Sequence, residues 1–464
     1  MTKEALGEIV MESEKDRKLK ISEKLSYGLG DLASNLIWGF IGSFLLYFYT
    51  DVALIPVAAT ATLFLVARIL DAFIDPVIGG FVDRTNTKYG RTRPYILFGI
   101  IPLAIILVLT FTTFDISNTQ KIIYAYVTYI VIGIVYSVVN IPYGALMPLM
   151  TRDTNEKAQL SSFRMVGMAT GNIFVTACTM PLVNALGKGN QRTGFFITTT
   201  IFAVIGIICY VIVSLKCKER YVETNTNIKK ESKSSISMTY KNAMKNTPWV
   251  VTVIFALLMF VKIGAVAAIT IFFCINVLKN PAMISILLPA LYVSVFFSAV
   301  ITPVFIKKFG HKKGNIISLI IYIAGFCIMP FFSNNMTLFI GIYFIANIFG
   351  GIGSGSVFGM TADSVDYNEW KFGERSEGTL YAGYSFATKV GMAIGGAAIG
   401  YVLAFTGYDA ANVTSSAVNG INIIYYAVPI ICSIIQIITL SFYKLDSIHP
   451  QIIKELEVRN NSEV

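Results

Sequence analysis

The sequence predicts an all-α membrane protein whose twelve transmembrane helices form two pseudo-symmetric six-helix bundles. Of its 464 residues, 55% are hydrophobic and 14% are charged, and the mean hydropathy is +0.66. A soluble protein has a more polar composition, so that class is excluded. Apolar runs long enough to cross about 30 Å of hydrocarbon recur along the whole chain. One long polar interruption, near 217–246, divides these runs into two sets of six.

The apolar runs set the boundaries of the predicted elements. The first six have the approximate limits 27–50, 58–82, 94–113, 121–148, 160–185 and 195–216. The second six have the approximate limits 248–276, 282–306, 314–332, 336–362, 378–406 and 420–443. The predicted domains are a cytoplasmic tail (1–26), a first bundle (27–216), a cytoplasmic linker (217–247), a second bundle (248–443) and a second cytoplasmic tail (444–464).

Weak internal similarities relate the two halves. DPVIGGFVDRTNTKYGRTRP follows the second span and TPVFIKKFGHKKG follows the eighth, each with a proline at the helix end and then a glycine followed by basic residues. Parallel half-repeats of this kind are typical of carriers that bind their substrate near the membrane midplane, between two related bundles. The alternative is that any basic, glycine-containing loop produces the same likeness.

The net charge of +10 is concentrated in alternate connections. Basic residues crowd the N-terminal tail and every second connection, and the remaining connections hold few. By the positive-inside rule both termini are cytoplasmic, in agreement with an even number of spans. This pattern predicts a multi-pass protein of the cell membrane, with the lipid bilayer rather than nucleic acid as its partner. The first 25 residues lack the apolar core of a signal peptide, so we expect no leader to be removed.

No pattern of residues suggests an enzyme or a bound cofactor. The six cysteines lie within or beside spans without paired spacing, so we expect neither a disulfide nor a metal site. Nothing resembles a nucleophile–base pair or a phosphate loop. The two histidines, His311 and His449, fall at predicted cytoplasmic positions. A proton relay within the membrane would therefore have to use carboxylates.

Three charged residues interrupt the second span, FLVARILDAFIDPVIGGFVD. Arg68, Asp71 and Asp75 lie about one helical turn apart on one stripe. A charge at the bilayer centre costs about 2.5–3.5 kcal/mol on insertion scales, so such residues usually face a cavity and mark an ion or substrate path. Two neighbouring carboxylates cannot both be ionised cheaply unless a proton or cation is shared between them. The alternative is an internal salt bridge of Arg68 with Asp71 that only joins helices.

Polar side chains in the fourth span suggest a sugar site. YSVVNIPYGALMP places Tyr136, Ser137 and Asn140 on one side of a helix just before Pro142. A proline exposes backbone carbonyls, which in transporters often happens where a ligand binds. Amide and hydroxyl groups can bind sugar hydroxyls, and an aromatic ring can cover the apolar face of a sugar. Polar contacts between helices are the alternative interpretation.

The first span carries a similar stripe. In GDLASNLIWGF, the residues Asp31, Asn35 and Trp38 recur at helical spacing and are assigned to the same substrate site. Trp38 could equally be an anchor at the lipid interface.

The second bundle contributes Lys389, in GYSFATKVGMAIGG. We predict that it is the one basic residue deep inside this bundle. A buried lysine needs a counter-charge, and Asp71 or Asp75 of the first bundle is the natural partner. The glycines around Lys389 would allow close packing of helices.

Charged residues also gather at the predicted cytoplasmic mouth. Asp363, Asp366 and Arg375 follow the tenth span, and we assign them to a charged gate. Its partners in the first bundle are expected among Asp83, Arg84, Arg91 and Arg152. A plain solvated loop is the alternative.

Several long motifs in order resemble one known family. They are YGLGD at 27–31, VARILDAFIDPVIGGFVDRTNTKYGRTRP at 66–94, YSVVNIPYG at 136–144 and ADSVDYNEWKFGERSEG at 362–378, with Lys389 downstream. Over about residues 25–445 the chain is similar to the glycoside–pentoside–hexuronide:cation symporters of the major facilitator superfamily. The resemblance implies the major facilitator fold and cation-coupled sugar uptake by alternating access.

The likeness to the melibiose carriers of that family suggests roles for single residues. Asp71 and Asp75 match the cation-site carboxylates, and Ser137 matches a hydroxyl ligand near them. Lys389 matches a lysine that links the two bundles. Arg164 matches an arginine of the sugar cavity, after a one-residue gap is allowed.

Departures from the melibiose pattern point to another sugar and ion. Asn35 and Asn140 stand where melibiose carriers have sugar-binding aspartates, and Gly144 replaces a tryptophan. This pattern is closer to the glucuronide and xyloside carriers. Ile74 stands where sodium-coupled members have a polar residue, and sodium needs more oxygen ligands than a proton does. We therefore expect a monomeric, proton-coupled xyloside or glucuronide symporter. The alternatives are a sodium-coupled galactoside symporter and a sugar exporter or sensor of the same fold.

Overall fold

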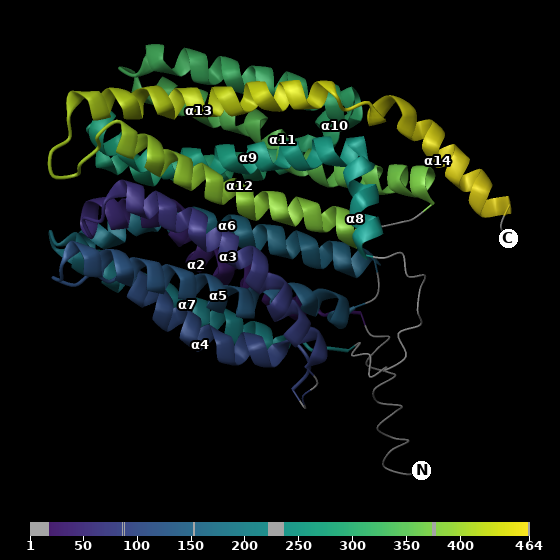
Figure 1. Ribbon diagram of the computed structural model, residues 1–464, viewed down its shortest axis with the longest axis horizontal. Coiled ribbons are helices and arrows are strands. Elements are labelled where there is room, and N and C mark those ends of the chain that lie inside the picture. Colours follow the sequence, from purple (N-terminus) through teal and green to yellow (C-terminus); the bar gives the residue numbers. More distant parts are fainter. Residues whose placement is uncertain are drawn as a thin grey trace, which may run out of the picture. The chain divides into compact units, whose positions relative to one another are not determined.

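The computed structural model describes residues 18–85, 87, 89–151, 154–220, 236–373 and 377–462. In these ranges the regular structure is helical, apart from one isolated bridge between Thr87 and Gly90 (Figure 1). Ten of the described helices are long and apolar enough to cross a membrane. Each of the twelve predicted spans lies on a helix, so the predicted all-α membrane class is confirmed.

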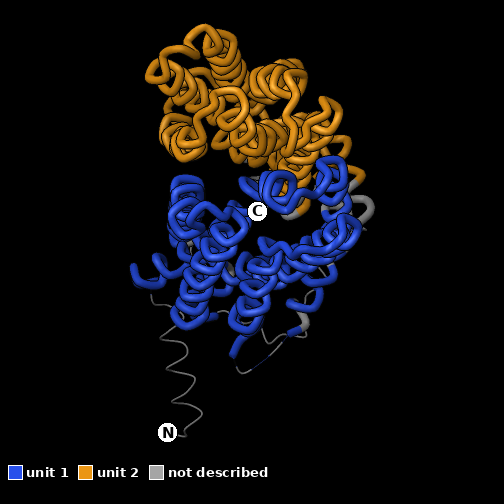
Figure 2. Tube along the Cα trace, turned by 90° about the vertical axis from the view of Figure 1, so that its left-hand side faces the viewer, with its two compact units in different colours: residues 1–227 blue, residues 228–464 orange. Residues whose placement is uncertain are grey.

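The chain divides into two compact units, residues 1–227 and residues 228–464 (Figure 2). The first unit contains α2 (Ile21–Tyr47) with a π-helical extension (Phe48–Val52), α3 (Val57–Arg84), α4 (Arg93–Thr110), α5 (Asn118–Met150), α6 (Thr154–Gly187) and α7 (Gln191–Lys216). The second unit contains α8 (Ile236–Lys245), α9 (Thr247–Phe272), α10 (Ile284–Ile328), α11 (Met336–Phe372), α12 (Glu377–Phe405), α13 (Ser415–Ser441) and α14 (Leu445–Ser462), with short π or 3-10 turns at Phe273–Val277, Pro281–Met283 and Met329–Phe332. Helix α8 lies within the predicted linker.

The two units pack corresponding helices in the same way. In the first unit, α2 packs along α6 and α7, and α4 packs on α7. In the second unit, α9 packs along α12 and α13, and α10 packs on α11 and α13. Small residues allow the closest approaches: a Cβ atom on Gly167 of α6 would overlap the carbonyl oxygen of Gly28 on α2. The shared pattern agrees with the half-repeats of the sequence.

One connection predicted as a loop is a sharp break within a long helix. Helix α10 contains the spans predicted at 282–306 and 314–332, and the backbone leaves helical geometry at Gly310, where φ is 75°. The Asp446 carboxylate accepts a hydrogen bond from the backbone N–H of Lys312 (2.7 Å). A Cβ atom on Gly310 would lie 2.9 Å from that carboxylate. Glycine is therefore needed here for its positive φ and for the close approach of Asp446.

The predicted C-terminal tail contains a packed helix. After a bend that is visible in Figure 1, α14 follows α13 and packs on α11. Its Leu445, Ile452 and Leu456 are buried in a core cluster that includes Met360 of α11. The indole N–H of Trp370 donates a hydrogen bond to Glu455 (2.6 Å). Helix α14 is thus an integral part of the second unit.

Candidate functional site

A partly buried ion pair joins α2 and α6 in the first unit. The guanidinium of Arg164 donates to both carboxylate oxygens of Asp31, at 2.5 Å from Nε and 3.3 Å from Nη2. The Tyr143 hydroxyl lies 2.8 Å from the same carboxylate, and the rings of Tyr27 and Tyr143 lie within 5.8 and 5.1 Å of the guanidinium carbon. The two-point contact and the aromatic faces hold Arg164 in one orientation.

Amide and hydroxyl groups continue this network along α2. Asn172 of α6 donates to the side-chain oxygen of Asn35 (2.8 Å). Ser34 lies 2.5 Å from the Tyr210 hydroxyl and 3.4 Å from the side-chain oxygen of Asn140. Asn35 and Asn140, which the sequence assigned to substrate binding, therefore belong to one polar network that spans α2, α5, α6 and α7.

An aromatic pair lies one turn further along α2. The rings of Trp38 and Tyr136 stack, with centroids 4.7 Å apart and an angle of 25° between their planes. The side chains of Trp38, Tyr136 and Asn140 are partly exposed. The first unit therefore combines amides, hydroxyls, a fixed arginine and an aromatic face, which are the groups that bind sugars.

Sequence reasoning missed Ser34, Asn172 and Tyr210 of this network, and it also missed two tyrosines, Tyr27 and Tyr143. The two tyrosines stand inside the motifs YGLGD and NIPYG, so the signal was present in the sequence. Tyr27 and Tyr143 are 116 residues apart in the sequence, and the hydroxyl of each donates a hydrogen bond to the backbone carbonyl of the other (3.2 and 2.6 Å).

Three of the predicted cation-coupling residues, Asp71, Asp75 and Ser137, lie on α3 and α5. Asp71 and Asp75 of α3 are both partly buried. The Asp71 carboxylate approaches Gly133 of α5 so closely that a Cβ atom there would lie 2.9 Å from Oδ1. Ser137, which is 7% exposed, follows Gly133 by one turn and shares its helix face. Asp71 therefore packs directly beside the α5 face that carries Ser137.

Replacing Gly133 with alanine should weaken cation coupling without unfolding the protein. The new methyl group displaces the Asp71 carboxylate, and we expect cation-driven uptake to fall about tenfold, equivalent to about 1.4 kcal/mol. Alanine is the better helix former, so thermal stability should be retained. Gly341→Ala on α11 is the matched control, because nothing lies within 4 Å of the added carbon. Equal uptake in the two variants would contradict this prediction.

The prediction that Lys389 lies deep inside the second bundle is wrong. Its side chain on α12 is exposed, since α12 packs on α9 through small residues such as Gly391 and Gly395 and turns Lys389 away from that contact. Among the described residues of this unit, the buried lysine is Lys262 on α9, which is 3% exposed. The coupling role of Lys389 stays a prediction.

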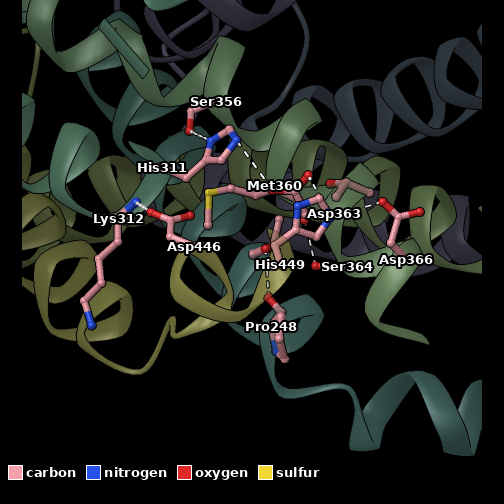
Figure 3. Close-up of polar contacts among 12 residues, drawn as sticks. Pro248, His311, Lys312, Ser356, Met360, Asp363, Ser364, Asp366, Asp446 and His449 are labelled. Atoms are coloured by element: carbon pink, nitrogen blue, oxygen red, sulfur yellow. Dashed lines mark hydrogen bonds and ion pairs between the residues drawn. The ribbon is translucent and has the colours of Figure 1, made fainter. Parts of the chain in front are cut away.

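The two gate carboxylates of the second unit contact both histidines of the chain (Figure 3). Asp363 lies 3.7 Å from Nε2 of His311 and 3.7 Å from Nε2 of His449, and Asp366 lies 3.1 Å from the latter atom. His311 is held by Ser356, whose Oγ lies 2.8 Å from Nδ1. Asp363 and Asp366 lie near the end of α11 rather than in a loop after it. His449 belongs to α14, so this cluster fastens α14 to the membrane helices.

The remaining predicted gate residues lie in the first unit or beyond the described residues. Arg91 precedes α4, where Glu219 accepts hydrogen bonds from the backbone N–H groups of Arg91 (2.7 Å) and Thr92 (2.8 Å) and so caps the helix. Sequence reasoning had placed Glu219 in a linker. Arg152 and Arg375 fall outside the described residues, as do the side chains of Arg68, Asp83 and Arg84. The pairing across the gate stays a prediction.

Comparison with known proteins gives consistent matches over most of the chain. A family model described as MFS/sugar transport protein matches residues 26–447. An isoprimeverose transporter of Lactiplantibacillus pentosus is 35% identical over 449 residues, which cover 95% of this chain and 92% of that protein. A putative 2,3-dihydroxypropane-1-sulfonate exporter of Escherichia coli (strain K12) is 30% identical over 464 residues, which cover 98% and 100%. The crystal structure of the nucleoside transporter NupG matches with a TM-score of 0.62 at 12% identity, over 92% of this chain and 99% of that one, so this likeness concerns the fold alone.

Proposed function

Because this chain belongs to the glycoside–pentoside–hexuronide:cation symporter family of the major facilitator superfamily, we propose that it is a proton-coupled symporter that imports a pentoside or hexuronide by alternating access. The chain is a multi-pass membrane transporter of the sugar transport family and not an enzyme. The observation that carries the proposal is the polar and aromatic face of the first unit. Asn35 and Asn140 supply amide groups there, and Trp38 stacks on Tyr136.

The coupling ion is proposed from the residues of α3. Asp71 and Asp75 lie one turn apart, so protonation of one relieves their mutual repulsion. Ile74, which immediately precedes Asp75, adds no oxygen ligand for sodium. A proton needs only one carboxylate, which favours proton over sodium coupling.

The Asp31–Arg164 pair favours a neutral glycoside over a uronide. A free arginine in the site would attract a carboxylate on the sugar, but here Asp31 already balances the charge of Arg164. The relative named as an isoprimeverose transporter agrees with a pentoside substrate. We therefore place a xyloside ahead of a glucuronide.

The direction of transport and the orientation are part of the same proposal. One relative is named as an exporter, so export is the competing function. The basic residues of alternate connections support cytoplasmic termini and placement in the cell membrane. We propose a working monomer, because each of the two units supplies one bundle of the fold.

Uptake of a panel of labelled sugars in membrane vesicles tests the substrate and the ion together. The panel holds a β-xyloside, a β-glucuronide, an α-galactoside and free xylose, with a proton or a sodium gradient imposed separately. We expect the xyloside to accumulate with the proton gradient alone. Galactoside uptake driven by sodium would contradict the proposal and favour the melibiose pattern.

A further inference from the structure

Lys262 on α9 is a buried cation that the proposed transport mechanism does not use. Its side chain is 3% exposed, and Nζ lies 3.3 Å from the side-chain oxygen of Gln436 on α13. Nζ also lies 4.3 Å from the ring centroid of Tyr322. The other ionisable group near it is the Cys432 thiol. Among the described residues no carboxylate pairs with Lys262, and the groups that contact its amino group are uncharged.

A small cavity adjoins this lysine within the second unit. Its volume is about 20 Å³, and residues of α9, α10 and α11 line it. Lys262, Tyr322 and Asn347 supply its polar groups, and the rest of the wall is apolar side chains and glycine, including Val266. A volume of about 10–15 Å³ holds one water molecule, so this cavity accommodates a single particle of water or halide size.

We propose that this cavity is a binding site for a small monovalent anion of the chloride type. An ammonium group has three N–H donors, and one acceptor, Gln436, is in place. An ionised group that is buried in the membrane without a counter-charge is costly, and a halide beside Lys262 would neutralise it. Asn347 uses one side-chain N–H to bond the Tyr343 carbonyl (2.8 Å), and the group has a second N–H for an anion. Sulfate and gluconate are larger than a halide and serve as the comparison anions.

Thermal unfolding of the purified full-length protein in detergent tests the site. We compare sodium chloride with sodium gluconate at equal ionic strength. A bound anion stabilises the folded state by mass action, so we expect Tm to rise saturably by about 3 °C with chloride or bromide and not with gluconate or sulfate. Lys262→Met should remove the rise. Lys454→Met, at an exposed position on α14, is the matched control and should retain it.

A second variant separates the cavity from the charge. Val266→Leu fills the cavity while Lys262 is kept, and we expect it to fold and to lose the chloride effect. The proposal would be overturned if chloride raised Tm equally in the wild type, Lys262→Met and Val266→Leu. It would also be overturned if chloride did not raise the Tm of the wild type, because the cavity would then hold only water. Crystals soaked in bromide give an independent readout: an anomalous peak beside Nζ of Lys262 is expected, and its absence would also overturn the site.

Discussion

Replacing Asp75 with cysteine should abolish uphill accumulation of the sugar. Asp71 and Asp75 lie one turn apart on α3, with Asp71 against Gly133 of α5. Removal of one carboxylate removes the shared site for the coupling cation, so sugar movement no longer draws on the gradient. In energised vesicles we expect the ratio of internal to external sugar to fall to about one, the value of passive exchange.

Counterflow of labelled sugar in the same vesicles shows whether the Asp75→Cys protein is folded and still binds sugar. Exchange should persist, because the polar network of α2, α5, α6 and α7 is intact. Asp115→Cys is the matched control: Asp115 is an acid whose side chain is 88% exposed, in an ion pair with Arg192. It should accumulate sugar normally. Normal accumulation by the Asp75→Cys protein would contradict the coupling role.

Replacing Arg164 with glutamine should remove sugar uptake and also lower stability. The change leaves Asp31, whose side chain is 13% exposed, without its cationic partner. Breaking a fully buried pair costs about 3–5 kcal/mol, and the 32% exposure of Arg164 reduces this to about 2–3 kcal/mol. We expect uptake to fall at least about a hundredfold, because Arg164 orders the network that contains Asn35.

A double-mutant cycle separates pairing from sugar binding. Asp31→Asn should destabilise the protein, and the Asp31→Asn/Arg164→Gln double variant should lose less stability than the sum of the two. Arg192→Gln, in the exposed Asp115 pair, is the control and should cost about 0.2–1 kcal/mol at most. Additive losses would show that Asp31 and Arg164 are not coupled. Wild-type sugar affinity in Arg164→Gln would limit Arg164 to a structural role.

The sequence was sufficient for the membrane class and the two sets of six spans, because runs of apolar residues report membrane crossing directly. Stripes such as Asp31, Asn35 and Trp38 were also visible, since helical spacing defines one face. The partners of these residues on other helices could not be predicted from the sequence. The Asp31–Arg164 pair joins positions 133 residues apart, and only the packing of α2 on α6 brings them together.

The wrong prediction for Lys389 and the failure to identify Lys262 and α14 have a common physical cause. Hydropathy shows that a lysine lies within a span but not which face of the helix packs on its neighbours. Lys389 was therefore predicted to be buried and is exposed, and Lys262, inside the seventh apolar run, was overlooked although it is buried. Likewise, polar composition concealed α14, whose Leu445, Ile452 and Leu456 form a narrow apolar stripe.

Sugar-driven proton movement in de-energised vesicles is the most direct test of cation-coupled symport. Right-side-out vesicles in weakly buffered, sodium-free medium receive a pulse of β-xyloside, and the external pH is recorded. A symporter carries protons inward with the sugar, so the external pH should rise, and the rise should vanish with Asp75→Cys and with a protonophore. A fall in external pH, as expected for a proton-exchanging exporter, would contradict proton symport. A constant external pH while labelled sugar enters would contradict it as well.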